Sequence, residues 1–301
     1  MTGKYRVALA ALAAGGAAAL AAAGSASGST ALRTIVYSSG INRGNSDIYL
    51  VSPAGAKLTR LTHNHALDMN PTWSPNGRQI AFESDMAESA PGDSDVFVMN
   101  ANGKGLHQLT FSNAFDGDPS WGRSNKIAFE SQRTGNTQIW AINPNGTGEK
   151  RLTNDSSFDG DPTWSPDGKK IAFTSTRDNG NREIYVMNAD GSDQTRLTNV
   201  PGINENPSWS PDGTEIAFDS NRNGNLEIYV MNADGSDQTR LTDNPALDAL
   251  PSWSLNSQQI VFVSDRFRKG MRRLYVMNAD GSHVRALTRG GFDGSPDWYR
   301  G

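Results

Sequence analysis

The stretch 159-DGDPTWSPDGKKIAFTSTRDNGNREIYVMNADGSDQTRLT-198 is one complete copy of a unit that the chain repeats. Its second half, IYVMNADGSDQTRLT, occurs letter for letter at residues 184–198 and again at 228–242. Tryptophans mark the copies at intervals of 48, 43, 45, 44 and 45 residues, and they are Trp73, Trp121, Trp164, Trp209, Trp253 and Trp298. A repeat of this length is typical of one blade of a β-propeller.

Each copy contains four short apolar segments separated by turn residues. In the quoted copy they are residues 162–164, 171–173, 184–187 and 196–198. The SPDG turn at 165–168 supplies a proline that presets φ and a glycine that tolerates positive φ, and the NADG turn at 188–191 has similar chemistry. The apolar segments are β-branched and aromatic, as strands prefer. The unit therefore predicts a four-stranded antiparallel sheet.

The number of copies predicts the size of the ring. The second apolar segment occurs at 34–37, 80–82, 127–129, 171–173, 216–218 and 260–262. A lone sheet this small cannot bury both faces, but sheets stacked around an axis bury each face against the next, with the tryptophans between them. We therefore expect an all-β fold, a six-bladed β-propeller of four-stranded antiparallel blades.

The two ends of the repeat region complement each other. Residues 34–37 form a second strand without a first, and residues 294–299 form a first strand without a second. Pairing the C-terminal strand with the N-terminal blade would close the ring and remove an open sheet edge. We expect the propeller to span residues 34–301, after a short linker at 27–33.

The N-terminus has the pattern of a secretory signal peptide. Lys4 and Arg6 precede an Ala/Leu-rich run at 7–23 and small residues that end at Ala26. We expect a signal peptide at 1–26, cleavage near Ala26, no transmembrane segment after cleavage, and a secreted or periplasmic protein of the cell envelope. The alternative is that the segment is retained as a membrane anchor.

Charge and cysteine content narrow the possible partners. The chain contains no cysteine, so no disulfide or thiol nucleophile is expected. Removing Lys4 and Arg6 changes the formal charge from -4 to -6. We expect the charges to be spread without a basic run, which argues against nucleic acid or an anionic membrane as partner and favours a cation or a basic surface. We expect a monomer.

The links between blades carry oxygen-rich pairs just before the innermost strands. We expect them to surround one mouth of the central channel as a partner-binding site, made of Asp68, Asn70, Asp116, Asp118, Asp159, Asp161, Asn204, Asn206, Asp248 and Asp293. The densest acidic group is Asp116, Asp118, Asp159 and Asp161, and hard cations such as calcium favour such clusters. No cofactor is required by the sequence, but a calcium ion could bind there.

An alternative role for these acids is structural. Each could cap its own loop or pair with a Ser-x-Arg segment on the same face, as at 131–133, 175–177, 220–222 and 264–266. His63 and His65 form a separate H-x-H motif, which would need a third ligand to hold a metal.

The unit P-[ST]-W-S-P-D-G-x-x-I-A-F, followed by E-I-Y-V-M-N-x-D-G-S and R-L-T, resembles the WD40-like repeats of the TolB β-propeller family across residues 34–301. The resemblance implies a six-bladed, non-enzymatic propeller of the periplasmic Tol-Pal system, whose propeller contacts the peptidoglycan-associated lipoprotein. The family's N-terminal α/β domain has no counterpart among the few residues between the predicted cleavage site and the first strand.

Two functions follow as hypotheses. The first is an exported, non-enzymatic scaffold that presents an acidic channel mouth to a protein or peptide in the cell envelope. The alternative is a divalent-cation-dependent carbohydrate-active enzyme or a glycan-binding propeller. The sequence contains no G-x-S-x-G, P-loop or H-E-x-x-H motif, and the repeats are nearly alike, whereas an active site needs a few odd residues among regular ones. We therefore predict no catalytic residue.

Overall fold

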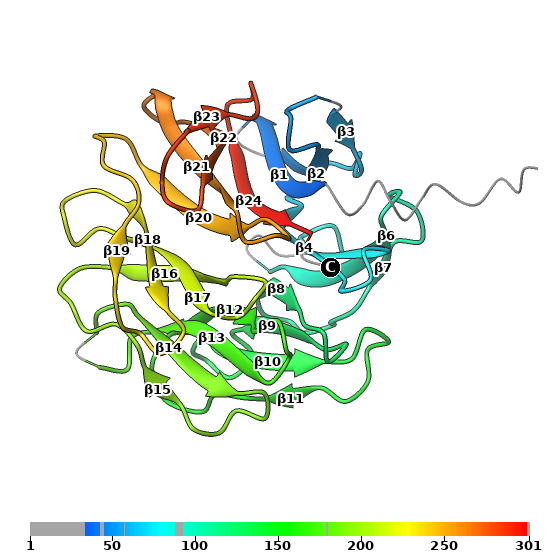
Figure 1. Cartoon of the computed structure of the whole chain (residues 1–301). Helices are drawn as coiled ribbons and strands as arrows, with labels where there is room; N and C mark the ends of the chain where they lie inside the picture. Colours follow the sequence, from blue (N-terminus) through cyan, green and yellow to red (C-terminus); the bar gives the residue numbers. More distant parts are fainter. Residues whose placement is uncertain (1–33, 43–44, 57, 88–92, 179, 300–301) are drawn as a thin grey trace, which may run out of the picture.

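The computed structural model describes residues 34–42, 45–56, 58–87, 93–178 and 180–299, and the predicted signal peptide and linker lie outside them. These residues form six four-stranded antiparallel sheets arranged around a central axis (Figure 1). The structure confirms the predicted six-bladed propeller. Within the described part of the chain, no helix is long and apolar enough to cross a membrane.

The blades follow one another along the chain, innermost strand first. Blade 1 contains β24 (Asp293–Trp298), β1 (Ile35–Asn42), β2 (Asn45–Val51) and β3 (Leu58–Arg60). Blade 2 contains β4 (Met69–Trp73), β5 (Gln79–Ser84), β6 (Asp95–Asn100) and β7 (His107–Gln108). Blade 3 contains β8 (Asp116–Trp121), β9 (Ile127–Ser131), β10 (Gln138–Ile142) and β11 (Lys150–Arg151).

The remaining blades repeat this order. Blade 4 contains β12 (Asp159–Trp164), β13 (Lys170–Ser175), β14 (Glu183–Asn188) and β15 (Thr195–Arg196). Blade 5 contains β16 (Asn204–Trp209), β17 (Glu215–Ser220), β18 (Glu227–Asn232) and β19 (Thr239–Arg240). Blade 6 contains β20 (Asp248–Trp253), β21 (Gln259–Arg268), β22 (Met271–Asn278) and β23 (Arg285–Ala286).

The ring closes as the sequence predicts. Strand β24 pairs antiparallel with β1, with Ile35 opposite Trp298 and Ser39 opposite Asp293. Figure 1 shows the red C-terminal strand beside the blue N-terminal one. Strand β24 therefore completes the first blade and leaves no open edge there.

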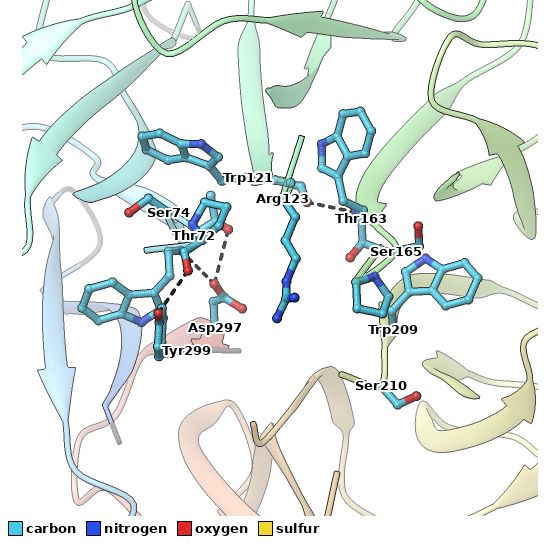
Figure 2. Close-up of a pocket in the computed structure, with 16 residues that line it drawn as sticks. Thr72, Ser74, Trp121, Arg123, Thr163, Ser165, Trp209, Ser210, Asp297 and Tyr299 are labelled. Carbon is cyan, nitrogen blue, oxygen red and sulfur yellow. Dashed lines mark hydrogen bonds between the residues drawn. The ribbon is translucent and has the colours of Figure 1, made fainter. Parts of the chain in front are cut away.

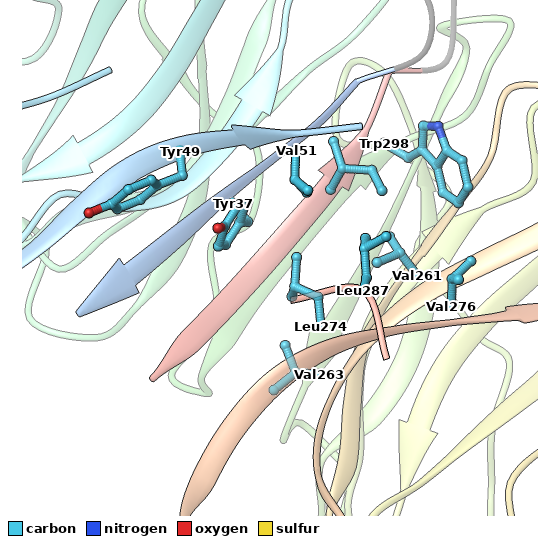
Figure 3. Close-up of a cluster of buried hydrophobic side chains, with 10 residues drawn as sticks. Tyr37, Tyr49, Val51, Val261, Val263, Leu274, Val276, Leu287 and Trp298 are labelled. Carbon is cyan, nitrogen blue, oxygen red and sulfur yellow. The ribbon is translucent and has the colours of Figure 1, made fainter. Parts of the chain in front are cut away.

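The hydrophobic core lies between the blades. In Figure 3, Trp298 of blade 1 packs with Val261, Leu274 and Val276 of blade 6. The other repeat tryptophans pack against the preceding blade in the same way, as Trp73 does against Val36 and Ile48. All six repeat tryptophans are buried, which confirms their predicted place between blades. The regular core positions the innermost strands around the channel.

Candidate functional site

A channel runs along the axis between the innermost strands. One end forms an open cavity of about 130 Å³ that is lined by three consecutive residues from each strand. The first of the three residues differs between blades and is Asn70, Asp118, Asp161, Asn206, Leu250 and Ser295. The second residue is always proline, and the third is threonine, serine or aspartate. Chemical variation at this mouth is therefore concentrated in the residue before the proline.

A β-bulge directs this residue into the channel. In every innermost strand the pairing register shifts at this point, as between Gly117 and Ser120 in blade 3. The residue before the proline has a positive φ, from 43° at Ser295 to 56° at Leu250. Asn and Asp tolerate this left-handed conformation better than other non-glycine residues. Bulges redirect side chains, so the bulge explains why this position faces the channel.

The first residue of each predicted pair has a different environment. Asp116, Asp159, Asn204 and Asp248 are buried and accept hydrogen bonds from arginines of their own blades. Arg133 reaches Asp116 at 2.6 Å, and Arg177 reaches Asp159 at 2.9 Å. These arginines come from the Ser-x-Arg segments. This geometry agrees with the structural alternative for the first position of these pairs.

Asp68 and Asp293 are also buried, but no arginine among the residues that the structure describes donates a hydrogen bond to them. Asp68 accepts hydrogen bonds from Ser84 at 2.5 Å and Asn64 at 2.9 Å. Asp293 accepts from Ser39 at 2.6 Å and from the Thr288 hydroxyl. Of the ten predicted site residues, the structure therefore brings four to the channel wall, namely Asn70, Asp118, Asp161 and Asn206. The other six stabilise the loops behind it.

Two glutamates that sequence reasoning missed complete the acidic cluster. Glu83 lies on β5 and accepts hydrogen bonds from the Asp118 backbone and the Asn70 side chain, both at 3.0 Å. Glu130 lies on β9 and accepts from the Asp161 backbone at 2.6 Å. Each glutamate thus bonds the bulge of the following blade. We call Glu83, Asp118, Glu130 and Asp161 the acidic cluster.

A glycine in the bulges of blades 3 and 4 makes room for these glutamates. A Cβ atom at Gly117 would lie 2.4 Å from a Glu83 carboxylate oxygen, and one at Gly160 would lie 2.3 Å from a Glu130 oxygen. The Asp-Gly-Asp sequences of blades 3 and 4 thus follow the two blades that carry a glutamate after the Ile-Ala-Phe strand. An Ile-Ala-Phe-Glu segment in one blade followed by Asp-Gly-Asp in the next is the sequence feature that could have identified both glutamates.

Burial makes the acidic cluster hard to ionise. Burial, together with the Asp161 charge, raises the pKa of Glu130 to about 8. Burial and the charges of Glu130 and Glu83 raise the pKa of Asp118 well above its usual range. Burial also raises the pKa of Glu83 and of Asp161. Removing these carboxylates from water disfavours their charged forms, and their mutual repulsion adds to this effect.

Three carboxylates of the cluster could share a cation. Asp118, Glu130 and Asp161 each offer an oxygen, and these oxygens lie within 4.8 Å of one another. Asp161 Oδ2 is buried and has no hydrogen-bond partner among the described residues. The predicted calcium ligands Asp116 and Asp159 instead bond arginines, and Glu130 takes their place. His63 and His65 are exposed on the surface.

The opposite end of the channel has different chemistry. A second cavity of about 80 Å³ shares Thr72, Ser120 and Thr163 with the first, so the two form one channel. Figure 2 shows Arg123 extending into this end. Arg123 stands where blades 2, 4 and 5 have the proline of the turn, at Pro75, Pro166 and Pro211. The channel is therefore acidic near one mouth and carries a cation near the other.

Comparison with known proteins agrees with this architecture. The sequence matches the family described as TolB beta propeller domain at residues 124–200, 150–229 and 193–299, which together span more than half of the 301-residue chain. The chain belongs to this TolB propeller family. A curated TolB homolog from Chlorobium chlorochromatii (strain CaD3) is 46% identical over 41 residues, which is 14% of this chain and 9% of that protein.

Solved structures show the same fold as this TolB-family propeller. TolB from Acinetobacter baumannii has a TM-score of 0.76 at 23% identity, and the match covers 88% of this chain and 66% of that one. A putative TolB from Agrobacterium tumefaciens has a TM-score of 0.68 at 25% identity, and the match covers 87% of this chain and 89% of that one. The chain thus spans slightly less than two thirds of the Acinetobacter protein.

Proposed function

We propose that this TolB-family propeller is an exported, non-enzymatic scaffold that binds a protein or peptide segment at the acidic mouth of its channel. The observation that carries the proposal is the acidic cluster, in which Asp118 and Asp161 face the channel beside Glu83 and Glu130. A lysine or arginine side chain of a partner would relieve the repulsion among these carboxylates when it enters the channel.

The fold itself does not require acids at these positions. Asn70 and Asn206 occupy the same bulge in blades 2 and 5, with φ of 48° and 54°. Each amide donates to a buried carboxylate of its own blade, at 3.0 Å to Glu83 and 3.2 Å to Asp219. In blade 3, Asp118 presents a second carboxylate to Glu130 instead of an amide. An acid retained at a cost to stability supports a functional role.

The test compares two charge-matched double variants. Asp118→Asn/Asp161→Asn copies the native asparagines of blades 2 and 5 and removes two carboxylates from the mouth. Asp190→Asn/Asp234→Asn removes two carboxylates from the NADG hairpins on the opposite face, where blades 2 and 3 have Asn102 and Asn145. Each protein, once shown to be folded, is used for affinity capture from cell-envelope and culture extract.

We expect a protein that is retained by the wild type and by the hairpin variant but lost by the channel variant. The channel variant should also be more stable to urea, because it loses buried like charges. Equal capture by all three proteins, or no capture, would contradict the proposed site.

A divalent cation is the second candidate occupant. The oxygens of Asp118, Glu130 and Asp161, with the unpartnered Asp161 Oδ2, fit the oxygen ligands that calcium prefers. Calorimetric titration with calcium should give binding to the wild type and none to Glu130→Gln. Turnover or retention of a polysaccharide that depends on added calcium would favour the carbohydrate-active alternative over the scaffold.

Export and an envelope location are proposed from the residues at 1–26. The test is N-terminal sequencing of the protein recovered outside the cytoplasm. A start close to residue 27 would support cleavage near Ala26, whereas an intact N-terminus in the membrane fraction would support the retained anchor.

A further inference from the structure

Blade 6 departs from the regular repeat in the length of its central hairpin. Strands β21 and β22 have 10 and 8 residues, whereas the equivalent strands of blades 4 and 5 all have 6. The extra length continues the pairing to Arg268 opposite Met271, on the same face as the acidic mouth. The tip of the hairpin, Lys269-Gly270, is therefore a structured projection of this blade.

The projecting part of the hairpin is basic. Residues 266–273 read RFRKGMRR and contain five basic residues among eight. Arg266 bonds Asp248 at 2.7 Å as part of its own blade, but Arg268, Lys269 and Arg272 are exposed. The expectation that the charges are spread without a basic run is wrong here.

Arg273 is a cation at a position where blades 1, 2, 4 and 5 have an acid and blade 3 has Gln138. The residue before the apolar part of the third strand is Asp95, Glu183 and Glu227 in blades 2, 4 and 5. These buried carboxylates accept hydrogen bonds from threonines at 2.8, 2.5 and 2.5 Å. In blade 6 the corresponding threonine, Thr288, donates to Asp293 instead. Because Thr288 donates to Asp293, it needs no acid at position 273, and this position holds an arginine.

The hairpin also exposes aromatic side chains. Phe267 is 59% exposed and Phe292 is 48% exposed. The Arg273 guanidinium stacks 3.4 Å from the centre of the Phe267 ring. The Arg272 backbone bonds Gly291 at 3.0 Å and holds the segment that carries Phe292 beside the hairpin. We call Phe267, Arg268, Lys269, Met271, Arg272 and Phe292 the hairpin patch.

Local hydrogen bonds fix the shape of the patch before any partner binds. Asp265 accepts from the Gly270 backbone at 2.9 Å and from the Leu247 backbone at 2.9 Å. Arg273 donates from Nε to the Gly290 carbonyl at 3.1 Å. A surface ordered in this way binds with a smaller loss of conformational entropy.

We propose that the hairpin patch binds an acidic protein segment that also carries large apolar side chains. Exposed cations next to exposed phenylalanines match a segment in which glutamate or aspartate alternates with phenylalanine or leucine. The proposal goes beyond the channel site, because the patch lies on blade 6 and its link to blade 1, across the ring from the acidic cluster of blades 2, 3 and 4.

The charges around the patch favour a peptide over an anionic membrane. The acidic mouth, lined by Asp118 and Asp161, opens on the same face as the hairpin patch. The solvent-accessible carboxylates of Asp243, Asp178 and Asp155 also lie in loops of this face, each within 3.4 Å of an arginine of blade 4 or 5. A flat anionic surface that met this face would approach these carboxylates and the acidic mouth. A single peptide strand can contact the hairpin patch alone.

The experiment uses a fluorescein-labelled peptide of alternating glutamate and phenylalanine, titrated with the mature chain at about 20 mM and about 300 mM salt. Arg268→Glu/Lys269→Glu/Arg272→Glu reverses the patch. Lys104→Glu/Lys126→Glu/Lys169→Glu makes the same charge change on exposed lysines of the opposite face. Folding of each variant is checked by its thermal transition.

We expect the wild type and the opposite-face variant to bind the peptide alike, and the patch variant to bind on the order of tenfold more weakly or worse. Phe267→Ser/Phe292→Ser should also weaken binding. High salt should weaken binding by the wild type. Equal binding by the patch variant, or equal binding of a lysine-phenylalanine peptide, would overturn the proposal. Failure of the glutamate peptide to bind would overturn it as well, whether or not phosphatidylglycerol vesicles bind. None of these results depends on Asp118 or Asp161, so the channel proposal is tested separately.

Discussion

Replacing Glu130 with glutamine should change how the stability of the propeller depends on pH. Glu130 is buried, accepts a 2.6 Å bond from the Asp161 backbone and has a pKa raised to about 8. The folded protein therefore keeps a proton on this carboxyl at pH values where the unfolded chain has lost it. The contribution of Glu130 to stability is present at low pH and is lost as pH rises through about 8.

The size of the effect follows from this shift. Where the folded state binds one proton more than the unfolded chain, each rise of one pH unit lowers the free energy of unfolding by about 1.4 kcal/mol. Between pH 6 and 8 the wild type should lose about 2 kcal/mol through Glu130, and more where Asp118 and Asp219 also lose protons. Glutamine keeps an oxygen acceptor for the Asp161 backbone but cannot ionise, so the variant should lose less.

Urea denaturation at pH 6, 7, 8 and 9 would measure the free energy of unfolding of both proteins. Asp190→Asn, an exposed carboxylate on the opposite face, is the control and should follow the wild type. Parallel curves for wild type and Glu130→Gln would refute the reasoning, because they would mean that Glu130 ionises in the folded protein as easily as in the unfolded chain.

Two further predictions concern the ring and its buried ion pairs. Deleting residues 292–301 should abolish the cooperative thermal transition measured by circular dichroism, because β24 and the buried Trp298 are lost; an unchanged transition would show that closure by β24 is dispensable. Arg133→Ala should cost about 3–5 kcal/mol in urea denaturation, because it leaves the buried Asp116 carboxylate without its partner. Asp116→Asn should cost far less, since Asn204 makes the same bond to Arg222 at 2.7 Å; equal costs for the two variants would contradict this account.

The fold could be predicted from the sequence because the same local signals recur in the copies of the repeat. Each SPDG turn, each Ile-Ala-Phe segment and each tryptophan is consistent with one blade, and the incomplete ends at 34–37 and 294–299 predict closure. The structure bears out the blades, the closure and the tryptophan packing. A core built from repeated units can therefore be predicted without knowing which distant residues contact each other.

The site could be predicted from the sequence only in part, because the bulge decides which side of the strand each residue faces. Regular alternation along a strand would place Asp116 and Asp118 on the same side. The bulge between Gly117 and Ser120 breaks this alternation, so Asp118 faces the channel while Asp116 is buried against Arg133. Glu83 was missed for a related reason, since its partners lie on its own blade and the next one.

The pattern of residues at the bulge separates what the fold needs from what a partner would need. A left-handed residue before proline favours asparagine or aspartate, so an acid at this position alone indicates geometry. Asn70 and Asn206 satisfy that geometry and also donate to the carboxylates of Glu83 and Asp219. Asp118 satisfies the geometry but places a second carboxylate beside Glu130. An asparagine at this position would instead donate a hydrogen bond to Glu130. The excess charge thus lies in one sector of the ring, where the nearby Arg182 donates its hydrogen bond to Glu205 and not to the acidic cluster. A binding role for that sector accounts for the acid more simply than any structural role does.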